Sequence, residues 1–149
     1  MPEALVRLRG VTCSRGSRQV LDRVDVTDPG LAAIEPVATL EEISAWRREI
    51  QATRVAEEVV GYVAAIVRTT RTLPAVELGA SPRAGVHLLA AARATAYLAG
   101  RDFVTPDDVA GQVKDVMRHR ILLRPEAELD RYIPENAIEA AMASVPVPR

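Results

Sequence analysis

The residues best suited to chemistry in this 149-residue chain lie in one short segment, Leu-Gly-Ala-Ser-Pro-Arg-Ala at positions 78–84. Ser81 is a favourable N-cap and Pro82 a favourable first helical residue, which places Arg83 in the first turn of a helix. Backbone N–H groups there, including that of Ala84, have no acceptor within the helix, and the helix dipole adds positive charge. Because a phosphate would satisfy the amides and the guanidinium together, the segment predicts an anion site centred on Arg83.

The arginine of this segment also has a purely structural interpretation, because a cation at a helix N-terminus is normally disfavoured. Its side chain could instead turn toward a carboxylate or water. Three further arginines could face an anion, namely Arg93, Arg118 and Arg120. Arg93 lies ten residues further along the same helix and about 80° around it, so it need not act with the first arginine. Arg118 and Arg120 are expected to neutralise a helix C-terminus or to pair with Glu126 and Glu128.

No pattern in the sequence supplies a complete catalytic or metal site. A nucleotide-hydrolysing core needs a glycine-rich phosphate loop followed by a lysine and a hydroxyl, and Lys114, the single lysine, is followed by Asp115. His87 and His119 have no cysteine partners or carboxylate cluster at ligand spacing, so no metal site is expected. Cys13 lies in no recognised activating context. We therefore expect no catalytic residue in this chain.

Composition and charge restrict the class of protein. With 48% hydrophobic and 26% charged residues, the chain has the composition of a globular domain with its own core. Its net charge is −1 and its arginines are dispersed, so nucleic acid is not an expected partner. The single cysteine excludes an internal disulfide, and a cytoplasmic location is the expectation. The most apolar run, Val86 to Ala99, contains Arg93 and is too short to span a bilayer, so no membrane role is expected.

Apolar periodicity and capping residues predict an all-α bundle of about five helices in the larger part of the chain. The helices are expected to begin at Thr39, after Arg54, at Pro82, at Thr105 and at Pro134, and to end near Thr53, Pro74, Gly100, Arg120 and Ser144. The third helix has small residues over most of its surface and is therefore expected to be central. The apolar stripes of the first four helices contain Leu40, Ile43, Trp46 and Ile50; Val59, Val63, Ile66, Val67 and Thr70; Leu88, Leu89, Ala92 and Ala96; and Val109, Val113, Val116 and Met117.

Residues 1–33 differ from the rest of the chain. Two segments, 5–9 and 19–26, show partial alternation of apolar and polar residues, with glycines and a proline around them. This pattern is compatible with a short hairpin or with a loose arm, and the sequence does not choose between them. We therefore divide the chain into an unassigned arm or hairpin, 1–33, and a helical domain, 34–149.

Four blocks of the helical part carry a resemblance to a known family, at positions 62–71, 78–84, 100–109 and 145–149. The second contains Gly-Ala-Ser-Pro-Arg-Ala and the third Gly-Arg-Asp-Phe-Val-Thr-Pro-Asp-Asp, with His119-Arg120 following. These blocks in this order and spacing are far more specific than any one short motif. From about Ile34 to its last residue, the chain resembles the C-terminal helical lid of the MoxR-type AAA+ ATPases.

The resemblance implies a role in nucleotide sensing. In that family the lid closes over a nucleotide held by a preceding P-loop domain, and the arginine at the matching helix start, the sensor 2 residue, approaches the γ-phosphate. That position is Arg83 here, with Ser81, Pro82 and Ala84 as the helix N-terminus. The family also implies ATP and Mg²⁺ as cofactors of the complete ATPase only. Its implied partners are an AAA+ core or neighbouring subunits and von Willebrand factor A domain proteins, in a chaperone-like role in assembling or activating protein complexes.

Two functions follow as hypotheses. The preferred one is a free-standing or truncated lid, which contains no Walker motif and so does not hydrolyse ATP alone. The alternative is a non-enzymatic helical module that binds a protein partner through an exposed apolar groove. Phosphate-dependent changes near Ser81 to Ala84 would favour the lid, and tight binding of another ligand elsewhere would favour the module.

Overall fold

The computed structural model describes residues 8–15, 18–26 and 37–148, and the chain divides into two compact units, residues 1–39 and 40–149. In the first unit, β1 (Leu8–Arg15) and β2 (Arg18–Val26) pair antiparallel. Of the two forms that the sequence left open here, the hairpin is therefore the observed one. The unassigned region was predicted to cover positions 1–33, and its other positions, 1–7, 16–17 and 27–33, lie outside the described residues.

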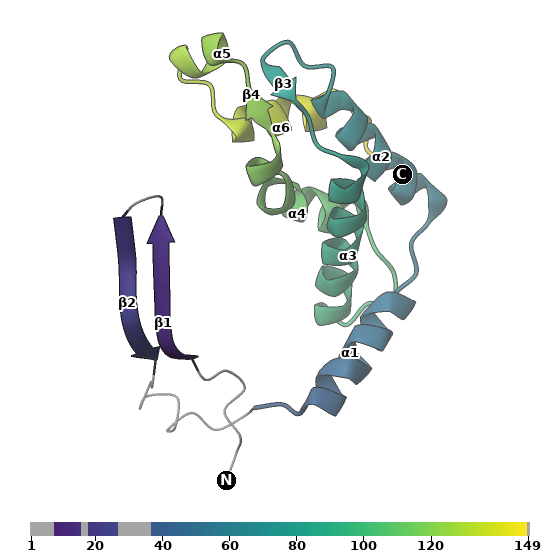
Figure 1. The fold of residues 1–149 in the computed structure, drawn as a ribbon. Helices are drawn as coiled ribbons and strands as arrows, with labels where there is room; N and C mark the ends of the chain where they lie inside the picture. Colours follow the sequence, from purple (N-terminus) through teal and green to yellow (C-terminus); the bar gives the residue numbers. More distant parts are fainter. Residues whose placement is uncertain (1–7, 16–17, 27–36, 149) are drawn as a thin grey trace. The chain divides into compact units, whose positions relative to one another are not determined.

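The second unit is helical, as predicted (Figure 1). Its described residues form α1 (Leu40–Ala52), α2 (Glu57–Thr70), α3 (Pro82–Leu98), α4 (Pro106–Met117), α5 (Pro125–Leu129) and α6 (Pro134–Ala143). The five expected helices are all present within a few residues of their expected ends, and the short α5 is additional. A 3₁₀ turn, η2 (Arg118–Arg120), follows α4. Within the described ranges, no helix has the length and apolar character needed to cross a membrane.

A small antiparallel ribbon joins two distant parts of this unit. It consists of β3 (Val76–Leu78) and β4 (Leu122–Leu123), with Val76 opposite Leu123 and Leu78 opposite Leu122. Strands of three and two residues are too short to show an alternating pattern, so the sequence gives no signal for them. The ribbon matters for position, because it brings the segment after α4 back beside the loop that leads into α3.

The predicted central helix, α3, packs against α1, α2 and α4 (Figure 1). Small residues allow this close packing: a Cβ added to Gly85 would lie only 3.3 Å from Cγ2 of Val67 on α2. Most of the predicted apolar stripes are confirmed as core. The buried members are Val59, Val63, Ile66, Val67, Thr70, Leu88, Ala92, Ala96, Val109, Val113 and Met117.

The amphipathic pattern of α1 predicted a helix correctly, but within residues 37–148 no element buries its apolar face. Leu40 is 73% exposed and Trp46 44% exposed. One polar contact also joins α1 to α3, because the Tyr97 hydroxyl at the end of α3 donates to the Glu49 carboxylate.

The start of α4 is the most strongly stabilised helix end in the described part of the chain. Thr105 is the N-cap, and its hydroxyl and the buried carboxylate of Asp108 form a capping box. Arg101 donates through both terminal nitrogens to the same carboxylate, at 2.7 and 2.6 Å. This guanidinium, together with the donors of Thr105, holds the pKa of Asp108 at about 2, well below its usual value, although burial opposes the shift. The carboxylate of Asp108 therefore has a structural role at the start of α4.

We expect the substitution Asp108→Asn to lower the free energy of unfolding at pH 7 by about 2 kcal/mol, the value of the pKa shift. Because the folded-state pKa is depressed, this stabilisation is present above the unfolded pKa of about 4 and is lost as pH falls toward 2. The measurement is urea denaturation of both proteins between pH 7 and pH 2.5. Asp107→Asn, the exposed neighbour, serves as the control with little change, and a pH-independent gap between Asp108→Asn and the parent would contradict the assignment.

Candidate functional site

Two side chains at the C-terminus of α2 fix the loop that precedes α3. Oγ1 of Thr70 accepts a hydrogen bond from the N–H of Ala80 at 3.0 Å and donates to the carbonyl of Val67 at 2.7 Å. Nε of Arg71 donates to the carbonyl of Ala80 at 2.8 Å. Ala80 is fully buried, so α2 satisfies both of its backbone polar groups.

The residue before Ala80 must be a glycine because the chain passes so close to α2. A Cβ at Gly79 would lie 2.7 Å from Cγ of Arg71 and 2.8 Å from its Cα and backbone nitrogen. Two of these three atoms belong to the backbone, which cannot move aside as a side chain can. The start of α3 is consequently held at a fixed place beside the end of α2.

The N-terminus of α3 begins where the sequence predicted. Ser81 occupies the N-cap position, with φ −81° and ψ 163°, and Pro82 is the first helical residue, but the Ser81 hydroxyl makes no capping hydrogen bond. The N–H of Ala84 donates to the carbonyl of Ser81 at 2.9 Å, and proline has no N–H. Fewer amides are therefore open to an anion than the sequence suggested, which shifts the weight of any anion binding to side chains.

Arg83, the second residue of α3, is exposed, and within the described ranges no hydrogen bond or ion pair involves it. Pairing with a carboxylate, the structural interpretation open from the sequence, is therefore not observed. The first turn of α3 also contains no acidic residue. The charge of this guanidinium adds to the positive end of the helix dipole without a protein counter-ion. Its function as an anion ligand stays a prediction.

The other candidate arginines lie in different surroundings. Arg118 pairs with Asp115 at 3.8 Å, and Arg120 contacts the chain's two histidines, His87 and His119. Of the two roles expected for these arginines, pairing with the two glutamates of α5 is not observed in the described residues, whereas Arg118 does lie at a helix C-terminus, as the C-cap residue of α4. Arg93 lies within α3, half-buried, and its Nε has no hydrogen-bond partner in the described residues.

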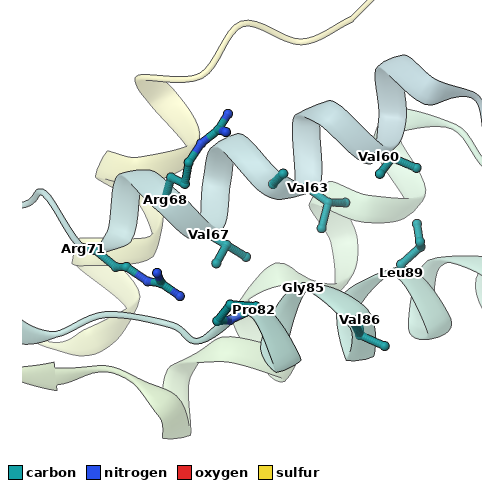
Figure 2. A pocket seen from close by; sticks show the side chains of 10 residues that line it. Val60, Val63, Val67, Arg68, Arg71, Pro82, Gly85, Val86 and Leu89 are labelled. Carbon is teal, nitrogen blue, oxygen red and sulfur yellow. The ribbon is translucent and has the colours of Figure 1, made fainter.

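An apolar groove with a volume of about 290 Å³ runs between α2 and α3, next to the start of α3. Figure 2 shows Arg68 and Arg71 at one end of it and Val60 and Leu89 at the other. Val86, on the α3 wall, is 68% exposed. The groove is lined by Val60, Val63, Ala64, Val67, Arg68, Arg71, Pro82, Gly85, Val86 and Leu89.

Comparison with known proteins identifies this arrangement. Residues 68–141, which span the loop, α3, α4 and the ribbon, match the family model of the AAA lid domain. The chain is also similar to Chaperone MoxR1 of Mycobacterium tuberculosis, with 34% identity over 142 residues that cover 89% of this chain and 37% of that protein. It belongs to the lids of the MoxR-type AAA+ ATPases.

The chain is also similar to two further proteins. The uncharacterised protein YeaC of Bacillus subtilis is 36% identical over 118 residues, which cover 79% of this chain and 37% of that protein. The crystal structure of a candidate ATPase from Cytophaga hutchinsonii superimposes with a TM-score of 0.69 at 27% identity, covering 73% of this chain and 36% of that one. The lid thus spans little more than a third of the length of the relatives that it matches.

Sequence reasoning selected Arg83 as a candidate but missed the residues that fix the start of its helix. Thr70 was assigned to an apolar stripe. Its hydroxyl could have indicated a contact with another segment, because a polar group on a buried face needs a hydrogen-bond partner. Gly79 gave no comparable signal, since a glycine before a helix is common for many reasons. The clamp formed by Thr70, Arg71, Gly79 and Ala80 becomes visible only when α2 and the loop are seen together.

We expect Gly79→Ala to destabilise the lid by about 1–3 kcal/mol, because the added Cβ would overlap backbone atoms of Arg71. The matched control is Gly61→Ala on the exposed face of α2, where a Cβ meets nothing within 4 Å. That change should stabilise by up to about 1 kcal/mol, since alanine favours a helix over glycine. Both are measured by urea denaturation, and a neutral or stabilising Gly79→Ala would show that the close approach does not constrain the loop.

Proposed function

We propose that this chain acts as the nucleotide-sensing lid of an AAA+ ATPase and that Arg83 binds the terminal phosphate of ATP. The observation that carries the proposal is the exposed guanidinium of Arg83 at the N-terminus of α3, without a protein counter-ion in the described residues. Such an arrangement is electrostatically unfavourable by itself and becomes favourable when an anion binds. The similarity to AAA lids supports a nucleotide phosphate as that anion.

The lid does not hydrolyse ATP alone in this proposal. Hydrolysis needs a phosphate-binding loop, a lysine and a Mg²⁺ ligand, which a P-loop core would contribute together with bound ATP and Mg²⁺. The lid contributes position: when ATP binds, the lid swings as a unit so that Arg83 approaches the phosphoryl oxygens on which negative charge develops. Loss of the γ-phosphate after hydrolysis removes that attraction and releases the lid.

The role of the assembled ATPase follows from its relatives and is part of the same proposal. One relative is named a chaperone. We therefore infer that the ATPase works on other protein complexes in the cytoplasm, with an AAA+ core and neighbouring subunits as direct partners. A protein with a von Willebrand factor A domain is the proposed further partner.

In the ATPase formed by this lid and its P-loop core, we expect Arg83→Ala to lower the turnover of ATP by about 100-fold, the usual effect of removing a donor to developing negative charge. The lid should keep its stability, because the Arg83 side chain is exposed. The measurements are steady-state phosphate release and thermal unfolding.

The control for this experiment is Arg47→Ala, which removes another exposed arginine from α1. It should leave turnover within about twofold, because it lies on a different helix and carries no proposed role. Unchanged turnover in Arg83→Ala would refute the sensing role, and an equal loss in both variants would point to net charge instead of position.

The groove between α2 and α3 favours a second candidate function, a module that binds a protein partner without nucleotide. Its apolar lining and the exposed Val60 and Val86 are the supporting observations. Isothermal calorimetry of the chain with ATP separates the two functions when the shifts of backbone amides near Ser81 to Ala84 are followed in parallel. Binding of ATP that perturbs this segment supports the lid, whereas tight binding of a protein to the groove in the absence of nucleotide supports the module.

A further inference from the structure

A second cation, Arg120, contacts the helix that contains Arg83 in its first turn, and the β3–β4 ribbon holds it there. The ribbon pairs Leu78, just before the loop that leads into α3, with Leu122, which is separated from η2 by one residue. Ile121, between η2 and β4, is buried and anchors the turn. The last residue of η2, Arg120, is thereby held against the first half of α3.

The contacts of Arg120 define its position. Its Nε donates to Nε2 of His119 at 3.0 Å, and its Nη2 lies 3.4 Å from Nδ1 of His87 on α3. A guanidinium has donors only, so each imidazole nitrogen in these contacts is the acceptor. The chain contains two histidines, and both of them contact this one arginine.

His87 also connects Arg120 with Arg83. The two residues Arg83 and His87 are four positions apart on α3, so their Cβ atoms lie on one face about 5–6 Å apart. Arg83 is therefore placed on the face of α3 that Arg120 contacts through His87. In the part of the chain that the structure describes, no ion pair with a carboxylate involves either arginine.

We propose that Arg120, positioned by His87 and His119, forms with Arg83 a two-guanidinium site for the terminal phosphate of a bound nucleotide. This inference rests on the proposed sensing role of Arg83 and adds a second ligand to it. A phosphate has enough oxygens to accept from both guanidinium groups, and its charge offsets the repulsion between two neighbouring cations. The two imidazoles act on Arg120 and not on the nucleotide, so they are positioning residues.

The test is a titration of the 149-residue chain with inorganic pyrophosphate, followed through the ring signals of the two histidines in ¹H–¹⁵N spectra. Saturable shifts of both rings are expected, because an anion on Arg120 changes the hydrogen bonds that it donates to them. Arg120→Gln and Arg83→Gln should each weaken pyrophosphate binding about tenfold, as for the loss of one charge-assisted hydrogen bond.

The matched control is Arg118→Gln. It removes one positive charge two residues before Arg120, from a side chain that pairs with Asp115. It should change the affinity by no more than about twofold. Equal losses in Arg118→Gln and Arg120→Gln would overturn the site in favour of a general cationic surface. Glutamate serves as a second probe, and if it binds as tightly as pyrophosphate, the site is one for carboxylates and the proposal fails.

The wild-type titration can overturn the proposal without any variant, since ring signals that do not move with pyrophosphate exclude a phosphate at Arg120. The experiments also distinguish failure of the two-guanidinium site from failure of the sensing role of Arg83. If Arg83→Ala lowers ATP turnover while Arg120→Gln leaves pyrophosphate binding unchanged, the lid function stands and the second ligand is refuted. If pyrophosphate binding depends on Arg120 while Arg83→Ala leaves turnover unchanged, the sensing role is refuted.

Discussion

The hydrogen bonds from α2 to the backbone of Ala80 decide where α3 begins, and the rest of the candidate site depends on them. Thr70 and Arg71 bind the N–H and the carbonyl of one buried residue. A buried backbone group without a partner costs more than a typical hydrogen bond contributes, so this loop has little freedom to move relative to α2. The helix start, with Arg83, is therefore fixed relative to α2.

The two proline-started helices of the lid show how differently one local pattern can be used. At the start of α4, Asp108 supplies the negative charge that a helix N-terminus favours, and Arg101 neutralises it in turn. At the start of α3 no acidic residue is present and an arginine takes its place. The first arrangement is complete within the described chain and stabilises the fold, whereas the second lacks negative charge, which a ligand can supply.

Much of the fold followed from local sequence signals, because those signals act over one helical turn or one cap. The stripe that contains Ile66 and the cap at Thr105 were both predicted, and both form as expected. The face of α1 that contains Trp46 was predicted from the same periodicity, but amphipathicity does not specify which surface covers a helix, and in the described residues it is partly exposed.

The details of the site were less predictable because they depend on contacts between distant positions. The contact of Arg120 with His87 joins residues 33 positions apart, and it exists because two very short strands pair. The sequence predicted for Arg120 either a helix C-terminus or the nearby glutamates, because it indicates only which residues are close along the chain. The position of Arg83 was predictable from serine and proline alone, whereas the absence of a counter-ion among the described residues could be seen only in the packed structure.

The measurement that tests the central claim most directly is chemical modification of Arg83 by phenylglyoxal in the ATPase assembled from this lid and its core, with mass spectrometry to locate the product. An exposed guanidinium without a partner should react readily in the presence of ADP, and a non-hydrolysable ATP analogue should block the reaction at Arg83 while Arg47 continues to react. Equal modification of Arg83 with the two nucleotides would contradict the claim that this arginine binds the terminal phosphate.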